Sequence, residues 1–280
     1  MRERLPEFLK RPIIDTDTTR NVRKNLKHNC LNTVCENARC PNKNECYTKN
    51  TATFLIMGNS CTRNCRYCNI SCNKPEPLDP QEPKHIAKAV NDLGLKYAVI
   101  TSVTRDDLPD GGAEHFANCI YEIRKFSPYV KIEILTPDFK NRKDSLETII
   151  KAHPDVFNHN IETVRALFKT ARPQGNYDNS LEVLKYIKQN SDIQTKSGMM
   201  IGLGETFEQI KETIEDLYNV GCDILTIGQY IQPSKEHLPV AKYYSLDEYE
   251  ELKKLAASIG IKNFQIGPLV RSSYNAASLV

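Results

Sequence analysis

Short apolar runs alternate with amphipathic stretches along most of this chain. The first run, residues 51–57, is largely apolar and ends at Gly58, which predicts a buried strand. Similar runs predict strands at residues 97–103, 130–135, 156–161, 196–203 and 223–231. These runs set the number of strands that the sequence predicts.

Helical periodicity fills the intervals between the predicted strands. Ile86, Val90 and Leu93 fall on one face of a helix that ends at Gly94. Two further helix starts carry the capping-box pattern, Thr206-x-x-Gln209 and Ser245-x-x-Glu248. Strand and helix therefore alternate about six times.

This alternation predicts an α/β fold, a partial parallel (β/α)6 barrel with its helices outside. In such folds the functional site lies at the C-terminal ends of the strands. We expect residues 51–235 to form the barrel and residues 1–50 to form a cysteine-rich N-terminal extension without periodicity. Residues 236–280 should add a C-terminal helix and a tail that closes the barrel mouth. No linker or repeat separates these regions, so one compact unit is expected.

Composition narrows the class of protein. The 280 residues are 40% hydrophobic and 26% charged, enough for a sizeable core. The net charge of +3 is small and spread along the chain, which argues against nucleic-acid binding. Mean hydropathy is −0.51 and no apolar run approaches membrane-spanning length, so a membrane partner is not expected either.

The N-terminal sequence and the cysteine count together indicate a compartment. Residues 1–20 lack an apolar signal region and contain acidic residues, which disfavours both secretory and organellar targeting. We therefore expect a cytoplasmic protein. The chain has ten cysteines, most of them close together in sequence. In a reducing compartment, clustered cysteines indicate metal binding or catalysis rather than disulfides.

Six of these cysteines form two triplets. Cys61, Cys65 and Cys68 follow the first strand with the spacing C-x3-C-x2-C. Three thiolates can hold three irons of a four-iron cluster, and the fourth iron is then open to a small molecule. A zinc site is the alternative, but zinc prefers four N or S ligands, and only Cys72 lies close by. We treat Cys72 as a non-ligand.

Residues 58–70, with Tyr67 between the last two cysteines, resemble the cluster loop of the radical S-adenosylmethionine superfamily. The resemblance implies a [4Fe-4S] cluster whose open iron is chelated by the amino and carboxylate groups of S-adenosylmethionine. Reduction of the cluster would then give a 5′-deoxyadenosyl radical.

Polar and glycine residues at other strand ends are candidate contacts to S-adenosylmethionine. With Tyr67, the candidates are Gly111, Gly112, Asn160, Glu162 and Glu205. Each has a structural alternative. The glycines are also typical of an ordinary turn, Asn160 and Glu162 of a strand-end cap, and Glu205 of a tight strand-to-helix turn.

The other triplet, Cys35, Cys40 and Cys46, has the spacing C-x4-C-x5-C. Together with the radical loop it resembles the lipoyl synthase family, and the likeness extends over roughly residues 30–277. Segments that carry it include residues 102–112, 228–234 and the Arg-Ser-Ser-Tyr tail at 271–274.

The resemblance implies that the first triplet holds a second, auxiliary [4Fe-4S] cluster with Ser273 as fourth ligand. It also implies that this cluster is consumed as the sulfur source. The structural alternatives are a frayed terminus at residues 271–274 and an electron-transfer cluster completed by another thiol, with Cys30 the nearest candidate. Cys119 and Cys222 are interpreted as small buried hydrophobes.

The function that the resemblance implies is insertion of sulfur at carbons 6 and 8 of an octanoyl group. That group is attached to a lysine of a lipoyl-carrier domain, either the glycine-cleavage H protein or an acyltransferase subunit of a 2-oxoacid dehydrogenase. Flavodoxin or ferredoxin would supply electrons, and a repair carrier would rebuild the spent cluster. Apolar strand ends at Leu135, Ile201 and Ile227 are either tunnel walls for the alkyl chain or plain core.

Two rival functions remain at this point. The first is radical sulfur insertion into a small molecule, in the manner of biotin synthase. The tail serine and the spacing of the first triplet disfavour it. The second is a non-catalytic carrier of electrons with two clusters, which the open second triplet disfavours.

Overall fold

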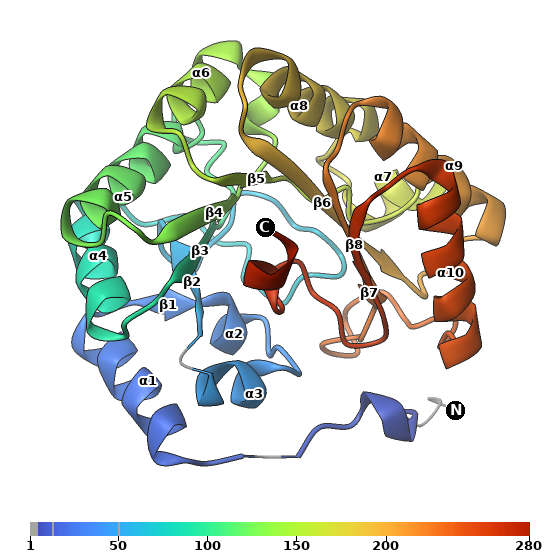
Figure 1. Cartoon of the computed structure of the whole chain (residues 1–280), viewed down its shortest axis with the longest axis horizontal. Helices are drawn as coiled ribbons and strands as arrows, with labels where there is room; N and C mark the ends of the chain where they lie inside the picture. Colours follow the sequence, from blue (N-terminus) through green and yellow to red (C-terminus); the bar gives the residue numbers. More distant parts are fainter. Residues whose placement is uncertain (1–4, 13, 50) are drawn as a thin grey trace.

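A curved sheet of eight strands, in the order β1 to β8, forms the centre of the computed structural model, which describes residues 5–12, 14–49 and 51–280 (Figure 1). The predicted extension 1–50 thus includes residues 1–4, 13 and 50, which lie outside the described residues. The strands are β1 (Asn32–Thr33), β2 (Thr53–Ile56), β3 (Tyr97–Ser102), β4 (Lys131–Leu135), β5 (Val156–Asn158), β6 (Gln194–Ile201), β7 (Ile224–Gln229) and β8 (Asn263–Ile266).

Strands β2 to β8 are parallel, and β1 pairs with β2 in the antiparallel sense. The helices are α1 (Asp17–His28), α2 (Val34–Asn37), α3 (Lys43–Thr48), α4 (Glu82–Asp92), α5 (Ala113–Phe126), α6 (Lys143–Ala152), α7 (Phe168–Ala171), α8 (Tyr177–Asn190), α9 (Phe207–Asn219) and α10 (Leu246–Ile259). None of the described helices has the length and apolar character needed to cross a bilayer.

The predicted partial parallel barrel is confirmed. The larger helices lie along the outside of the curved sheet (Figure 1). Among the described residues no ladder of hydrogen bonds joins β8 to β1, so the barrel stays open. Both predicted capping boxes are present at the starts of α9 and α10.

The predicted strand count is wrong by one. Seven strands are parallel rather than six, because β8 pairs with β7 inside the region that the sequence assigns to helix and tail. This strand has four residues, begins at the exposed Asn263, and only its last residue, Ile266, is buried. So short and polar a run carries no clear periodicity-of-two signal.

The N-terminal region is also more regular than predicted. Helix α1 begins with a capping box between Thr16 and Thr19, and buries Thr19, Val22 and Leu26. The helix is amphipathic, but its apolar stripe is narrow and its other positions are polar, so the segment is too poor in apolar residues to stand out in the sequence. The helix is held by packing against α3 and α4 rather than by its own composition.

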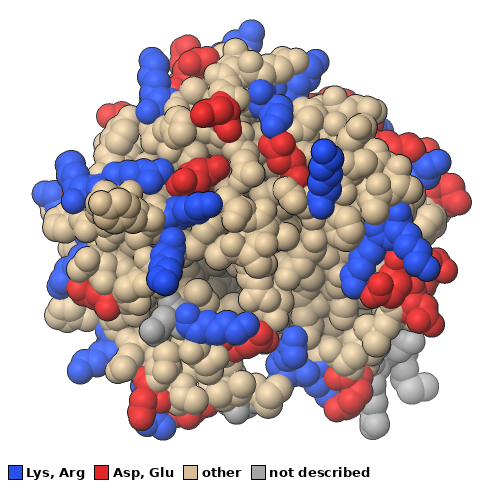
Figure 2. Space-filling model, in the orientation of Figure 1, with Lys and Arg blue, Asp and Glu red and all other residues tan. Residues whose placement is uncertain are grey.

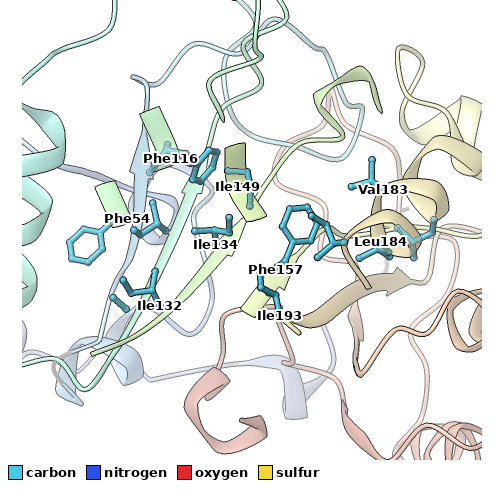
Figure 3. Packing of buried hydrophobic residues seen from close by; sticks show 14 of the residues in the cluster. Phe54, Phe116, Ile132, Ile134, Ile149, Phe157, Val183, Leu184 and Ile193 are labelled. Carbon is cyan, nitrogen blue, oxygen red and sulfur yellow. The ribbon is translucent and has the colours of Figure 1, made fainter. Parts of the chain in front are cut away.

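The main core lies between the convex face of the sheet and the helices (Figure 3). Side chains alternate along a strand, so Phe54, Ile132 and Phe157 face the helices while their neighbours face the barrel interior. Ile201 and Ile227 are fully buried members of this core, which favours the core interpretation over tunnel walls. Cys119 and Cys222 are buried as predicted.

The barrel interior contains a buried ion pair. Lys196 Nζ on β6 lies 2.9 Å from Glu133 Oε2 on β4, and both side chains are 0% exposed. Glu133 also accepts hydrogen bonds from the Tyr97 hydroxyl at 2.7 Å and from Asn158 Nδ2 at 2.9 Å. Because every charge here has partners on other strands, the network fixes four strands relative to one another.

The C-terminal tail lies on the concave side of the sheet (Figure 1). A Cβ at Gly228 would lie 2.0 Å from the Val270 carbonyl oxygen, and one at Gly198 would lie 2.5 Å from Ser272 Oγ. Glycine at these two positions of β6 and β7 therefore leaves the space through which the tail passes. Asn42 Nδ2 donates to the Leu269 carbonyl at 2.6 Å and ties the tail to the N-terminal region.

The buried pair gives a first prediction. Lys196→Met leaves Glu133 charged and buried without its cation, so the free energy of unfolding should fall by about 3–5 kcal/mol. Adding Glu133→Leu should recover a large part of that loss. Urea unfolding measures both, with Lys188→Met as control, since Lys188 and Asp223 form an exposed pair that is worth less than about 1 kcal/mol. Equal losses in Lys196→Met and the control would contradict this role.

Candidate functional site

The second cysteine triplet lies in the loop directly after β2, at the C-terminal edge of the sheet. Cys61 Sγ accepts backbone N–H groups from Arg63 at 3.4 Å and from Thr104 at 3.3 Å. The Cys68 N–H donates to the Cys65 carbonyl at 3.0 Å and closes a tight turn. The loop is therefore shaped by its own backbone and by the segment after β3.

The three thiols of this loop lie close enough to repel one another when ionised. Burial raises the pKa of Cys68 to about 12, and the charges of Cys65 and Cys61 add to the shift. Burial also raises the pKa of Cys65. Such thiolates need a cationic partner, and irons of a cluster would supply it.

Arg63, inside the triplet, anchors the loop to the barrel. Its guanidinium donates to both oxygens of Asp106, at 2.7 and 3.0 Å, and to both oxygens of Asp138, at 2.8 and 2.6 Å. Burial lowers the pKa of Arg63, but the hydrogen bonds to Asp138 and Asp106 raise it by more, so the guanidinium stays charged. Two bidentate pairs fix the loop over the ends of β3 and β4. Sequence reasoning missed this role, since both aspartates are distant in sequence.

Glu162 lies beside the triplet. Burial raises its pKa, and the guanidinium of Arg172 acts in the opposite direction. Tyr67 and Cys65 share this environment, because the charge of Glu162 raises the pKa of both. Glu162 has a φ of +70°, an uncommon conformation for a side chain of this size. The fold thus brings three predicted residues of this loop and strand end together.

Asn160 completes this group. Its Nδ2 donates to Glu162 Oε1 at 3.2 Å, and its Oδ1 accepts from Ser272 Oγ at 2.8 Å. A cavity of about 80 Å³ lies here, lined in part by Asn160, Glu162, Gly228, Arg271 and Ser272. The C-terminal tail therefore reaches the candidate site for S-adenosylmethionine.

The remaining predicted contacts have structural partners of their own. Gly112 has a φ of +91° at the start of α5, where an added Cβ would lie 2.3 Å from Met57 Sδ. Gly111 donates its N–H to the Leu108 carbonyl at 3.1 Å in the same turn. The Glu205 carboxylate accepts from the N–H groups of Gly202 at 2.5 Å and Leu203 at 2.9 Å. These arrangements favour the turn interpretation for all three residues.

The sequence analysis missed Arg172, and it considered His159 only as part of the polar strand end at residues 158–162. His159 is buried beside the same strand end, its Nδ1 lies 2.8 Å from the Thr136 carbonyl, and burial lowers its pKa to about 4. Within the described part of the chain, His159 Nε2 and Arg172 Nε have no hydrogen-bond partner. Buried polar atoms left without partners are typical of a ligand or water site. His159 directly precedes Asn160, which could have identified it, whereas Arg172 lies twelve residues further along the chain and gives no such signal.

The first triplet lines a larger cavity of about 320 Å³. Cys35 comes from α2, Cys46 from α3, and Cys40 from the turn between them. Burial raises the pKa of Cys35 to about 12 and that of Cys46 to about 11, and the neighbouring Cys40 adds to both shifts. Ser273 of the tail lines the same cavity.

Two contacts hold the tail at this cavity. The Tyr274 hydroxyl donates to Glu45 Oε1 at 2.8 Å, and Lys49 Nζ donates to Asn275 Oδ1 at 3.4 Å. The tail is therefore not a frayed terminus. Cys30, the alternative fourth ligand, is exposed, as is Cys72.

The two cysteine loops touch each other. Asn69 Nδ2, one residue after Cys68, donates to the Asn37 carbonyl at 2.8 Å. Within the described residues, no three His, Cys, Asp or Glu side chains converge on a single metal ion. Cysteines that hold a cluster each bind a different iron, so they stand further apart than ligands of one ion.

Comparison with known proteins decides the family. The radical SAM superfamily profile matches residues 55–217. A lipoyl synthase of Caldicellulosiruptor bescii is 53% identical over 272 residues, which cover 97% of this chain and 94% of that protein. A lipoyl synthase of Caldanaerobacter subterraneus subsp. tengcongensis is 49% identical over 277 residues, 99% of this chain and 97% of that protein.

The chain belongs to the lipoyl synthase family. As a lipoyl synthase family member and a radical SAM protein, it is a sulfur-inserting enzyme that uses S-adenosylmethionine and a [4Fe-4S] cluster.

Solved structures agree on the fold of this lipoyl synthase family member. Streptococcus suis SuiB bound to S-adenosylmethionine aligns with a TM-score of 0.60 at 14% identity, over 79% of this chain and 52% of that one. Methylornithine synthase aligns with a TM-score of 0.57 at 13% identity, over 87% of this chain and 70% of that one. At these identities the likeness supports the radical SAM fold alone.

Arg63 gives the second prediction. Arg63→Lys keeps the charge but cannot form two bidentate pairs, so the loop should hold iron about 10- to 100-fold less tightly. Iron retention is measured against a chelator, in a variant whose first triplet is replaced by alanine. The matched control is Arg124→Lys, which alters the half-buried pair between Arg124 and Asp155 at 2.9 Å. Unchanged iron retention in Arg63→Lys would exclude the anchoring role.

Proposed function

We propose that this enzyme inserts sulfur at carbons 6 and 8 of an octanoyl group held on a lysine of a lipoyl-carrier domain. The observation that carries the proposal is the placement of Ser273 in one cavity with Cys35, Cys40 and Cys46. A serine oxygen is a harder ligand than a thiolate and releases iron more easily. Such a site suits a cluster that is taken apart during the reaction.

When bound, the two proposed clusters would supply the chemistry that side chains cannot: reductive cleavage of S-adenosylmethionine to a hydrogen-abstracting radical at one, and sulfide at the other. Cys61, Cys65 and Cys68 are proposed to hold the first cluster. Cys35, Cys40, Cys46 and Ser273 are proposed to hold the second.

The chain's other residues orient the reactants. Glu162 and Asn160, beside Tyr67 and Cys65, are proposed to bind the polar groups of S-adenosylmethionine. Arg172 Nη1 holds the Asn160 carbonyl at 3.2 Å and leaves Nε free for a ligand carboxylate. Because the Asn37–Asn69 contact joins the two loops, an alkyl chain can meet both sites without a large movement.

Partners follow from the family. The carrier is proposed to be the glycine-cleavage H protein or a 2-oxoacid dehydrogenase acyltransferase subunit, with flavodoxin or ferredoxin as electron donor. A separate carrier would rebuild the spent cluster, and the cytoplasm is the proposed compartment.

Lys, Arg, Asp and Glu side chains are interspersed around one face of the molecule, and a hollow opens between them (Figure 2).

The two rival functions are less well supported. A small-molecule sulfur inserter has no need of the Ser273 tail at the first triplet. An electron carrier should complete both clusters with thiolates, yet Cys72 is exposed and outside the turn formed by Cys65 and Cys68.

The test is anaerobic reconstitution with iron and sulfide, followed by S-adenosylmethionine, dithionite and an octanoyl-lysyl carrier domain. Mass spectrometry should show the carrier gaining two sulfurs and losing two hydrogens in its disulfide form, with 5′-deoxyadenosine released. Release of 5′-deoxyadenosine with no change in the carrier would reject the substrate. Absence of both from a sample with about eight irons per chain would favour the electron carrier.

Single substitutions should separate the two sites. Ser273→Ala should leave formation of 5′-deoxyadenosine largely intact and lower sulfur insertion by at least about tenfold, because the cluster loses its labile ligand. Cys65→Ala should abolish 5′-deoxyadenosine itself. Ser258→Ala serves as the control, because Ser258 is an exposed serine on α10 whose hydroxyl donates to the Leu255 carbonyl at 2.8 Å. Normal sulfur insertion in Ser273→Ala would refute the ligand assignment.

A further inference from the structure

Arg271, two residues before Ser273, occupies a position shared by the two candidate sites. It lines the cavity of the first triplet and also the smaller cavity next to Asn160 and Glu162. The exposed part of Arg271 therefore borders these two cavities. Nothing in the proposed function uses this side chain.

The guanidinium has no anionic partner from the protein's carboxylates. Its one described hydrogen bond runs from Nη1 to its neighbour's carbonyl, that of Val270, at 2.6 Å. Among the described residues no Asp or Glu forms an ion pair with Arg271. A half-buried cation that lacks a partner has lost part of its hydration, and an anion bound beside it offsets that cost.

Lys49 shows the contrast within the same cavity. Lys49 also lines the cavity of the first triplet, but its Nζ lies 3.0 Å from Glu45 Oε1. Its charge is therefore already balanced by the protein. Two cations border one cavity, and only Arg271 lacks a carboxylate.

The position of Arg271 depends on a glycine in strand β7. A Cβ at Gly228 on β7 would lie 3.0 Å from Arg271 Nη1 and 2.0 Å from the Val270 carbonyl oxygen. Any other residue at this position would displace the side chain from the cavity wall. The space left by Gly228 therefore fixes both the tail and the guanidinium.

We propose that Arg271 is the counter-charge of the auxiliary site, paired with the anionic cluster that Cys35, Cys40, Cys46 and Ser273 hold. This inference rests on the ligand assignment in the proposed function. Three thiolates and a serine alkoxide carry more negative charge than the core of an oxidised four-iron cluster neutralises. A guanidinium beside that anion offsets part of the excess.

The proposal predicts opposite effects of one substitution in two states of the protein. In cluster-free protein, Arg271→Met removes a half-buried charge that has no carboxylate partner among the described residues, and should raise the melting temperature by about 2–4 °C. In cluster-loaded protein the same change removes the partner of an anion. The melting temperature should then fall by a similar amount, and a chelator should remove iron about tenfold faster.

The experiment uses the full chain with Cys61, Cys65 and Cys68 replaced by alanine, so that only the auxiliary site binds iron. Arg271→Lys should restore slow iron release, since it keeps the charge. Lys43→Met is the matched control. Lys43 is close to the first triplet in sequence but is not among the residues that line the cavity, and its Nζ is already paired with Glu36 at 2.8 Å. Its removal should therefore change iron release less than twofold, as expected for exposed pairs.

Three results would overturn the proposal. The first is an equal loss of melting temperature with and without the cluster, which indicates a purely structural role. The second is iron release in Arg271→Met no faster than in Lys43→Met. The third is fast release in Arg271→Lys, which indicates that shape rather than charge matters. If the parent protein binds no iron at all, the ligand assignment itself fails, and the parent alone reveals this.

Discussion

The C-terminal tail passes along the concave face of the sheet because Gly198 and Gly228 carry no side chain where it runs. An open barrel leaves its interior polar groups and strand faces to be covered by some other segment. Here the covering segment also carries chemistry. It brings Ser272 to Asn160 at one cavity and Ser273 to the cysteine triplet at the other. The same segment thus fills the barrel interior and reaches both candidate sites.

Buried charge is arranged in three different ways in this molecule. Lys196 and Glu133 neutralise each other inside the barrel, and Arg63 is neutralised by two aspartates beneath the radical loop. In both cases hydrogen bonds from several strands meet the cost of desolvation. Arg271 differs, since its balance has to come from something bound. The charge pairs inside the barrel and beneath the radical loop are complete. Among the described residues, Arg271 at the cavity of the first triplet has no carboxylate partner.

Both cysteine triplets lie on short segments whose backbone is fixed by contacts from elsewhere. The radical loop depends on Thr104 and Arg63, and the first triplet depends on the tail through Asn42 and Tyr274. Hydrogen bonds within such a short loop do not fix it relative to the rest of the protein, so contacts with other segments have to do so. The barrel supplies the rigidity, and the loops supply the proposed ligands.

Local signals in the sequence were enough for much of this structure. The alternation of apolar runs with helical periodicity fixed the fold class, since each element records its own burial in its own spacing. The sequence did not predict strand β8 and helix α1, because both contain few apolar residues and depend on packing against the rest of the protein. The cysteine spacings identified both candidate cluster loops, because all ligands from one loop are close in sequence.

What the sequence by itself could not determine depends on contacts between distant segments. Only the tertiary structure brought Ser273 into the cavity of the first triplet and turned Glu205 back onto its own N–H groups. It alone paired Arg63 with Asp138, 75 residues away, and left Arg271 without a carboxylate. Residue type and spacing determine which groups can act, but partners, burial and charge balance arise when the chain closes on itself.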